Sequence, residues 1–171
     1  MEMANTKSLG MPNVRFHVNF SNTEVPTPRG MDKVAFLFSA NLGAPLQNIS
    51  QVASGGETAR VMLSLKALLS GTVCLPTIIF DEIDTGVSGS VANAVGEVIA
   101  TLSSTMQVID ITHLPQVASK GNRHYLVYKS DSTTNMRVLT DNERITEIAK
   151  MLSGDSVTDA AIAQAKILLQ K

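Results

Sequence analysis

Two adjacent acids stand where a buried strand is expected to end, a position suited to metal and water chemistry. The run Thr77–Asp81 is short and almost wholly apolar, which predicts a strand of a parallel sheet buried on both faces, and Glu82 follows it directly. Open α/β sheets bind their ligands at the carboxyl ends of strands. There Asp81 can hold Mg²⁺, and Glu82 can orient a water for attack on a phosphoryl group. The alternative is a strand end whose two acids simply face solvent.

Ser54, Gly55 and Gly56 precede an apolar pattern of helical period, so they mark the start of a helix. Free backbone N–H groups and the positive end of a helix attract anions, and glycines allow a phosphate to come close to the backbone. Glu57, in the first turn, is better suited to capping the helix or contacting a ribose hydroxyl than to capturing phosphate. An ordinary serine N-cap with a flexible entry loop remains open as the alternative.

His113 follows a second apolar strand, expected over residues 106–112. A strand, a helix and a strand in this order form a βαβ unit, whose two strands are close neighbours. We therefore expect His113 to lie within reach of the same ligand as Asp81 and Glu82. Taken alone, a histidine at a strand end is usually a structural hydrogen-bonding residue. The other two histidines and the lone cysteine lack the spacing of metal ligands, so a zinc site is not expected.

The elements that must position these residues follow from hydrophobic periodicity. Strands are expected at 14–20, 33–39, 77–81 and 106–112, with a hairpin over 123–140. Helices are expected from residue 56 to about 70 and at 91–102, 142–152 and 156–169. The segment Ser21–Gly30 is rich in proline, glycine and polar residues, and we expect a loop there. No internal repeat occurs, so the pattern predicts one compact α/β domain over residues 1–171.

Composition narrows the class of protein. The 171 residues are 44% hydrophobic and 17% charged, which is typical of a globular domain with a well-covered core. A formal net charge of −1 gives no global positive field to draw the chain onto nucleic acid. A single cysteine excludes an internal disulfide framework and fits a reducing compartment. The first ten residues lack the apolar core of a signal peptide and no run is long enough to span a membrane, so we expect a soluble cytoplasmic protein without a membrane partner.

Taken together, these features follow the order of the C-terminal half of an ATP-binding-cassette (ABC) ATPase head. The run SGGE resembles the signature motif, TIIFDE the Walker B strand and ITH the switch histidine. Longer stretches are similar to the RecN family of bacterial DNA repair proteins, relatives of the structural-maintenance-of-chromosomes (SMC) ATPases. These stretches include QVASGGETARVMLSLK, FDEIDTGVSGSVANAVG and ITHLPQVASKGNRHYLVYK. The resemblance runs from about Leu9 to Leu169 and so covers nearly the whole chain.

The resemblance implies a head built from two lobes, of which this chain would be one. It would be the C-terminal lobe of an ABC/SMC-type P-loop ATPase head, with a mixed sheet and flanking helices. The phosphate-binding Walker A pattern, G-x-x-x-x-G-K-[ST], does not occur in the sequence. In the family that loop lies in an N-terminal lobe, separated from this one by a long coiled coil. Residues 1–8 are accordingly expected to be a coiled-coil stub or an artefact of expression.

The resemblance also assigns roles and partners. Asp81 would bind Mg²⁺, Glu82 would polarise the attacking water, and His113 would contact the γ-phosphate of ATP. The nucleotide of a second head would be contacted by the signature residues Ser54, Gly55, Gly56 and Glu57. The implied partners are the protein's own N-terminal lobe, a second RecN-like head in a homodimer, and DNA bound by the full-length protein at the nucleoid. This chain alone is expected to lack ATPase activity.

One position departs from the ABC pattern. In many ABC ATPases an aspartate ends the loop after Walker B, and Ser88 stands at that place here. RecN-like sequences resemble this chain in that respect, so the departure bears on coupling across the dimer and not on family membership. Two other interpretations stay open: the head lobe of a different SMC-type ATPase, and a non-catalytic module that dimerises or contacts DNA.

Overall fold

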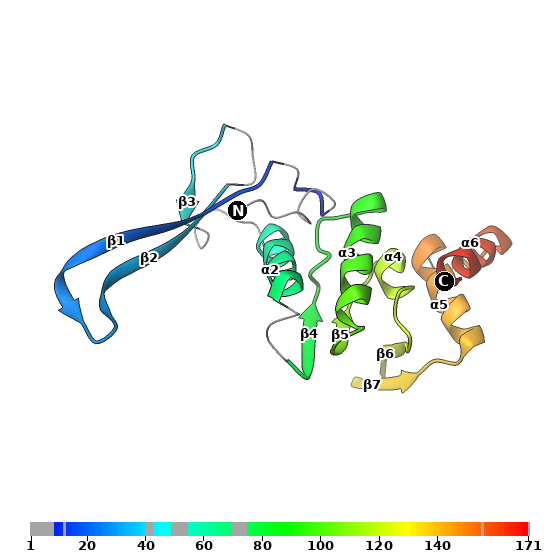
Figure 1. The fold of residues 1–171 in the computed structure, drawn as a ribbon. Coiled ribbons are helices and arrows are strands. Elements are labelled where there is room, and N and C mark those ends of the chain that lie inside the picture. The colour runs from blue at the N-terminus through cyan, green and yellow to red at the C-terminus, as the bar shows by residue number, and fades with distance from the viewer. Residues whose placement is uncertain are drawn as a thin grey trace.

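The computed structural model describes residues 9–11, 13–39, 43–48, 55–69, 75–154 and 156–170. The described part of the chain contains both strands and helices, which alternate from α2 to β6 (Figure 1), and this confirms the expected α/β class. The strands are β1 (Arg15–Thr27), β2 (Gly30–Ser39), β3 (Gln47–Asn48), β4 (Thr77–Asp81), β5 (Gln107–Ile111), β6 (Tyr125–Ser130) and β7 (Thr133–Val138). The helices are α2 (Gly55–Leu69), α3 (Gly89–Leu102), α4 (Pro115–Ala118), α5 (Asp141–Ser153) and α6 (Asp159–Leu169).

The described strands form three small sheets. β1, β2 and β3 are antiparallel neighbours, β4 and β5 form a parallel pair, and β6 and β7 form the expected antiparallel hairpin. Parallel and antiparallel pairing are thus both present, in separate sheets of the described part of the chain. The β1–β2 ribbon reaches away from the helices, whereas α3 lies between α2 and α4 and contacts both (Figure 1).

The β1–β2 ribbon is longer than the sequence pattern predicts. The loop expected over Ser21–Gly30 is wrong, because β1 continues to Thr27 and β2 begins at Gly30. Pairing continues through polar residues, such as Ser21 opposite Lys33. A β-ladder is made by backbone groups, so a ribbon with both faces in solvent does not need apolar side chains to continue.

The β4–α3–β5 unit has the parallel arrangement that the sequence predicts. β4 and β5 pair along their whole lengths, from Thr77 opposite Gln107 to Asp81 opposite Ile111. The helix between them begins at Gly89, slightly before its expected start, and ends at the expected residue. Because parallel neighbours end at the same edge of a sheet, the two segments that leave these strands start out side by side.

α3 and α4 approach each other closely at Gly96. A β-carbon at this position would lie 3.1 Å from the backbone oxygen of Gln116 and 3.0 Å from Cγ of Lys120. Lys120 also forms an ion pair across this contact, with its Nζ 2.6 Å from the carboxylate of Glu97. α4 is not evident in the sequence, since four residues are too few to show a hydrophobic period.

Only one face of the β4–β5 pair is covered in the described part of the chain. Ile78 and Phe80 are buried in the main core. On the opposite face, Ile79, Ile109 and Ile111 are 64%, 45% and 52% exposed. The prediction that this strand is buried on both faces is therefore wrong for this chain. The strand is apolar, as the sequence shows, but no described element packs over its second face.

A second bare apolar surface lies on the β6–β7 hairpin. Tyr125 pairs with Val138 and Val127 pairs with Met136, so these four side chains share one face of the hairpin. Each of them is more than half exposed. Contiguous exposed apolar surface is typical of a region that another polypeptide covers.

Two apolar clusters hold the described elements together. The larger one joins α2, α3, β4 and the residues before β1, and its fully buried members are Leu9, Phe38, Val61, Leu63 and Val95. The smaller one packs α5 against α6 through Ile148, Ala149, Ala161 and Ala165. Among the described helices, none is long and apolar enough to cross a membrane.

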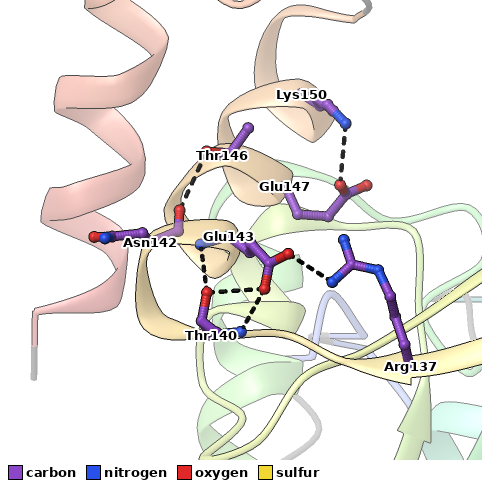
Figure 2. Close-up of polar contacts among 7 residues, drawn as sticks. All are labelled: Arg137, Thr140, Asn142, Glu143, Thr146, Glu147 and Lys150. Carbon is purple, nitrogen blue, oxygen red and sulfur yellow. Dashed lines mark hydrogen bonds and ion pairs between the residues drawn. The ribbon is translucent and has the colours of Figure 1, made fainter.

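α5 begins at a reciprocal cap, shown in Figure 2. The hydroxyl of Thr140 accepts from the N–H of Glu143 at 3.4 Å, and the Glu143 carboxylate accepts from the N–H of Thr140 at 2.8 Å. Arg137 donates to the same carboxylate at 2.6 Å. These bonds, led by the one from the Thr140 backbone, lower the pKa of Glu143 to about 2. One turn further on, Nζ of Lys150 lies 3.5 Å from Oε2 of Glu147 (Figure 2).

Candidate functional site

The ends of β4 and β5 lie side by side and carry the predicted site residues. Asp81 ends β4 opposite Ile111, which ends β5. The N–H of Glu82 donates to the carbonyl of Ile111 at 3.0 Å, so the two segments are still joined after they leave the sheet. His113 stands just beyond Ile111. The expectation that the two strand ends are neighbours is therefore confirmed.

Glu82 has a backbone conformation that is unusual for a residue with a side chain. Its φ is 49°, in the left-handed region. Its carbonyl accepts two hydrogen bonds from Thr85, one from the N–H at 3.2 Å and one from the hydroxyl at 2.8 Å. With its own N–H bonded to Ile111, the backbone of Glu82 is fixed on both sides. Strain of this kind persists where the surroundings impose it, and it clusters at functional sites.

The side chains of Asp81, Glu82 and His113 are exposed. Among the described residues, no hydrogen bond or ion pair joins the side chains of any two of them. Within the described part of the chain they therefore form an open edge of the sheet and not an enclosed pocket. An open edge of this kind needs a second surface before it can exclude water from a bound ligand.

The oxygen donors at this edge are better suited to a Mg²⁺ ion that is bound together with a nucleotide than to a metal ion that only the protein binds. The described residues contain no group of three or more His, Cys, Asp or Glu side chains that could hold a metal ion. In nucleotide sites Mg²⁺ takes only one or two protein carboxylates and completes its shell with phosphate oxygens and water. Asp81, exposed and next to Glu82, therefore fits a Mg²⁺ ion that arrives with a nucleotide.

Two buried carboxyl groups lie behind this edge, and the sequence analysis does not identify them. Asp84 is only 1% exposed, and one of its oxygens accepts a hydrogen bond from the hydroxyl of Thr112. Asp110 lies on β5 opposite Phe80. Within the described part of the chain, the second oxygen of Asp84 and both oxygens of Asp110 have no hydrogen-bond partner. Such groups are costly to bury as charges.

The charge of Asp84 acts on the neighbouring carboxyl group of Asp110. Burial, and after it the charge of Asp84, raises the pKa of Asp110 to about 7. Below this pH the Asp110 carboxyl is mostly protonated, which relieves its repulsion with Asp84. Asp110 shares a face of β5 with Val108, which is partly buried in the core, whereas Ile109 and Ile111 lie on the exposed face. The sequence shows this period of two but not which of the two faces is covered.

The glycine pair begins α2, as the sequence predicts. Gly55 and Gly56 are the first residues of this helix, and Glu57 follows in its first turn. Ser54 lies outside the described residues, and the structure describes only the backbone of 55–58. The anion site proposed for this helix start stays a prediction.

Ser88, which stands where an aspartate is usual, occupies the N-cap position of α3. Its backbone is extended, with φ −156° and ψ 172°, and its side chain makes no capping hydrogen bond. A serine at this position commonly caps the helix. Because Ser88 does not, the need for a helix cap does not explain why a serine stands here.

Comparison with known sequences finds relatives along nearly the whole chain. The DNA repair protein RecN of Bacillus subtilis is 42% identical over 184 residues, which cover 96% of this chain and 32% of that protein. RecN of Deinococcus radiodurans is 40% identical over 171 residues, covering 98% of this chain and 30% of that protein. The chain thus spans about a third of the length of these relatives and matches their C-terminal part. No protein-family profile matches the chain.

Solved structures share the fold at low sequence identity. The Smc head domain of Pyrococcus yayanosii, with a coiled coil and joint, superimposes with a TM-score of 0.65 at 19% identity, over 87% of this chain and 28% of that one. A structure from a study of ATP-driven dimerization and DNA-stimulated activation of SMC ATPases gives a TM-score of 0.58 at 16% identity, over 90% of this chain and 89% of that one. The likeness confirms the expected fold, that of a lobe of an SMC-type head.

Proposed function

This chain corresponds to the C-terminal part of the RecN family of DNA repair proteins, and on that premise we propose that it supplies one half of an ATPase head. The reaction proposed is hydrolysis of ATP, that is, phosphoryl transfer to water. The observation that carries the proposal is the bond from Glu82 to Ile111, which sets the acid pair beside the segment that leads to His113. Because the chain spans about a third of its relatives, the rest of the head belongs to another part of the protein.

The roles of the three exposed side chains follow from their chemistry. Asp81 is the proposed ligand of Mg²⁺, which in this chemistry offsets the charge of the phosphates. Glu82 is the proposed general base, which orients the attacking water and accepts its proton. His113 donates a hydrogen bond to the γ-phosphate. The fixed backbone of Glu82 supports its role, because a base acts efficiently only from a defined position.

The start of α2 is proposed to contact a nucleotide held by a second head. The N–H groups of the first helical turn lack partners within the helix and attract phosphate. The residues in this role are Ser54, Gly55, Gly56 and Glu57. Two heads would then form a homodimer with nucleotide between them. ATP-driven dimerization of the related SMC ATPases supports this arrangement.

The bare face of β4 and β5 is proposed to receive the protein's own N-terminal lobe, which would carry the Walker A loop. Ile79, Ile109 and Ile111 present apolar surface on the same face of the β4–β5 pair as Asp81. Covering that face would exclude water from the acid pair and strengthen its interactions with a bound phosphate.

The full-length protein is proposed to act on DNA in double-strand-break repair, in the cytoplasm at the nucleoid. Its sequence relatives are DNA repair proteins, which supports this assignment. A net charge of −1 does not favour DNA binding by this lobe, so the DNA contact is assigned to the full-length protein. We propose that residues 1–171 form one domain of that protein, with 1–8 lying outside the described residues.

Two substitutions in a head that contains both lobes test the catalytic proposal. Glu82→Gln keeps the shape of the side chain but removes the base, so ATP binding should stay within about twofold while kcat falls by about 100-fold or more. Asp81→Asn should instead weaken binding of Mg²⁺–ATP. This chain alone should show no turnover above the blank, because the phosphate loop is missing and both positioning and charge stabilisation are lost.

The measurements are ATP affinity by calorimetry and the steady-state release of phosphate. Unchanged turnover in Glu82→Gln would overturn the role of Glu82 as base. Equal loss of ATP binding in both variants would show that the two acids do not divide the work as proposed.

A second candidate function is a non-catalytic interaction module, which the bare β6–β7 face favours. Titration with ATP, in the presence and absence of the N-terminal lobe, separates the two candidates. Binding that requires both lobes supports the ATPase half-site. Binding in neither case, with stable association of the two polypeptides, supports the module.

A further inference from the structure

The segment that follows β4 is joined to the end of β5 and to the residue after it by two hydrogen bonds of opposite direction. The N–H of Glu82 donates across to the carbonyl of Ile111 at 3.0 Å. The hydroxyl of Thr112 donates back to the carboxylate of Asp84. Glu82 thus lies in a turn that is tied to the neighbouring segment at two of its residues. Shifting one segment along the other would break both bonds.

The hydroxyl of Thr112 also fixes the backbone around His113. It accepts a hydrogen bond from the N–H of Leu114 at 3.0 Å while donating to Asp84. His113 is therefore held between two residues that share one hydroxyl, although its own side chain is exposed. Besides the bond from Glu82 to Ile111, the hydroxyl oxygen of Thr112 connects the turn that carries Glu82 to the segment that carries His113.

Asp84 is a firm anchor for this connection. It is 1% exposed, and its carbonyl accepts from the N–H of Val87 at 3.3 Å, which closes the turn around it. Within the described residues, Thr112 is the hydrogen-bond partner of its carboxylate, and the second oxygen has none. Loss of the Thr112 hydroxyl would leave a buried acceptor alone, which is costly, so the turn would have to rearrange.

We propose that Asp84 and Thr112 are positioning residues, which hold the base Glu82 and the phosphate contact His113 in one fixed relation through the shared hydroxyl of Thr112. The inference rests on the proposed ATPase function and deepens it. Neither residue touches the reacting atoms. Both act through the two side chains that do, so their loss should affect turnover more than ATP binding.

Paired substitutions in the two-lobe head separate the hydroxyl from the volume of the side chain. Thr112→Val keeps the shape but removes the donor, and kcat should fall by about 10- to 100-fold with ATP affinity within twofold, as expected for a misplacement of about 1 Å. Thr112→Ser keeps the hydroxyl and should retain most of the activity. Asp84→Ala should match Thr112→Val, and the double variant should be no worse than either alone, because both break the same link.

Thr101→Val is the matched control. It removes a threonine hydroxyl that donates to the carbonyl of Glu97 within α3, away from the site, and should leave turnover unchanged. Glu82→Gln, measured in parallel, separates the positioning role of Thr112 from the proposed ATPase function. If Glu82→Gln has lost ATP turnover while Thr112→Val keeps full turnover, the positioning role is overturned and the ATPase proposal is not affected. Full activity in Glu82→Gln overturns the ATPase proposal instead.

Hydrogen exchange in this chain, without the second lobe, tests the link independently of activity. In Thr112→Val the amide of Glu82 should exchange at least about tenfold faster, although its own acceptor, Ile111, is untouched. The amide of Ile148, buried between α5 and α6, should keep its rate. Unchanged protection of Glu82 would show that the two hydrogen bonds are independent, and would overturn the inference even if the head proved inactive.

Discussion

Asp110 has a carboxyl group that holds its proton more tightly in the folded protein than in the unfolded chain. Its pKa rises from 3.8 to about 7, first by burial and then by the charge of Asp84. Between these values the folded state binds more protons, so stability falls as the pH rises through this window. We predict that Asp110→Asn, which does not titrate, is more stable than the parent chain above pH 7. The gain should be on the order of 2 kcal/mol, allowing for incomplete burial.

Urea unfolding at pH 8 and pH 4.5 measures this effect. The advantage of Asp110→Asn should be largest at pH 8 and should shrink towards pH 4.5, where the parent carboxyl is protonated in the folded state. An advantage that is the same at both pH values would mean that the carboxyl does not titrate as described.

Thr140 supports the start of α5 through its hydroxyl, and removing this hydroxyl should change both the stability of the chain and the pH dependence of that stability. Thr140→Ala loses a helix cap, which costs about 1 kcal/mol at neutral pH. It also removes one of the donors that lower the pKa of Glu143 to about 2. Because this pKa lies below the value of 4.5 for the free side chain, the stabilisation is present above pH 4.5 and is lost as the pH falls towards 2. The variant should therefore lose less stability over this range.

Thr146→Ala is the control for this prediction. Its hydroxyl donates to the carbonyl of Asn142 inside the same helix, at 3.1 Å, and caps no helix end (Figure 2). Chemical unfolding at pH 7, 4 and 2.5 should show a near-neutral effect for Thr146→Ala. If the free energy of unfolding depends on pH in the same way in Thr140→Ala and in the parent, the Thr140 hydroxyl does not help to lower the pKa of Glu143.

At the scale of single residues, the sequence predicted where the two apolar runs end and that these ends are neighbours. Asp81 ends the first run and Glu82 follows it, His113 follows the second run, and strand pairing brings the two runs together. Asp84 and Asp110 were missed for opposite reasons. Asp84 looks like an ordinary turn residue, and nothing local shows that its turn folds inward. Asp110 sits inside an apolar strand, where its orientation depends on which face the rest of the protein covers.

At the scale of elements, the contact between α3 and α4 depends on the missing side chain of Gly96. Gly96→Ala should gain about 0.5–1 kcal/mol of helix propensity. It should lose about 1–3 kcal/mol from overpacking, because the backbone oxygen of Gln116 would lie 3.1 Å from the new methyl group. We predict a net loss of about 1 kcal/mol, measured as a lower midpoint of thermal unfolding.

Asn93→Ala isolates the propensity term, since Asn93 is exposed on the same helix. This control should be slightly stabilising. If Gly96→Ala proved as stable as Asn93→Ala, α4 would have moved away without cost, and the close contact would not be important for stability.

The helices and strands could be predicted where the hydrophobic period and the capping residues of the segment itself determine its structure. α5 occupies 141–153, against an expected 142–152, because an amphipathic stripe and a threonine cap mark it clearly. α6 begins at Asp159 and not at 156, since Thr158 is the residue that caps it, accepting from the N–H of Ala161 at 3.2 Å. The extended ribbon of β1 and β2 was not predictable, because strand pairing between polar segments leaves no periodic signal.

At the scale of the whole molecule, the proposed head uses the start of α2 on a partner's nucleotide. Ser54→Arg should block ATP-driven dimerisation by placing a bulky side chain where the partner's phosphate approaches. ATP binding by a single head should stay nearly unchanged, because it depends on that head's own phosphate loop. Size-exclusion chromatography with and without ATP measures the first effect, and calorimetry measures the second.

Mixing two defective heads decides whether the contact is made across the dimer. Ser54→Arg is combined with a head whose phosphate loop is inactivated. Such a pair still contains one intact composite site, formed by the phosphate loop of the first head and the signature of the second. Partial recovery of ATPase activity is the expected result. No recovery, in samples where dimers are shown to form, would mean that the glycines serve their own head or no nucleotide at all.

The bare isoleucines of β4 and β5 also have a consequence for genetics. An exposed apolar surface can be covered by another part of the same polypeptide or by a separate polypeptide. If the proposed N-terminal lobe covers this face, the two halves of the proposed head could be encoded by separate genes, and we expect them to complement each other. A cell that makes this half without its counterpart would tolerate it only at low abundance, since uncovered apolar strands promote aggregation.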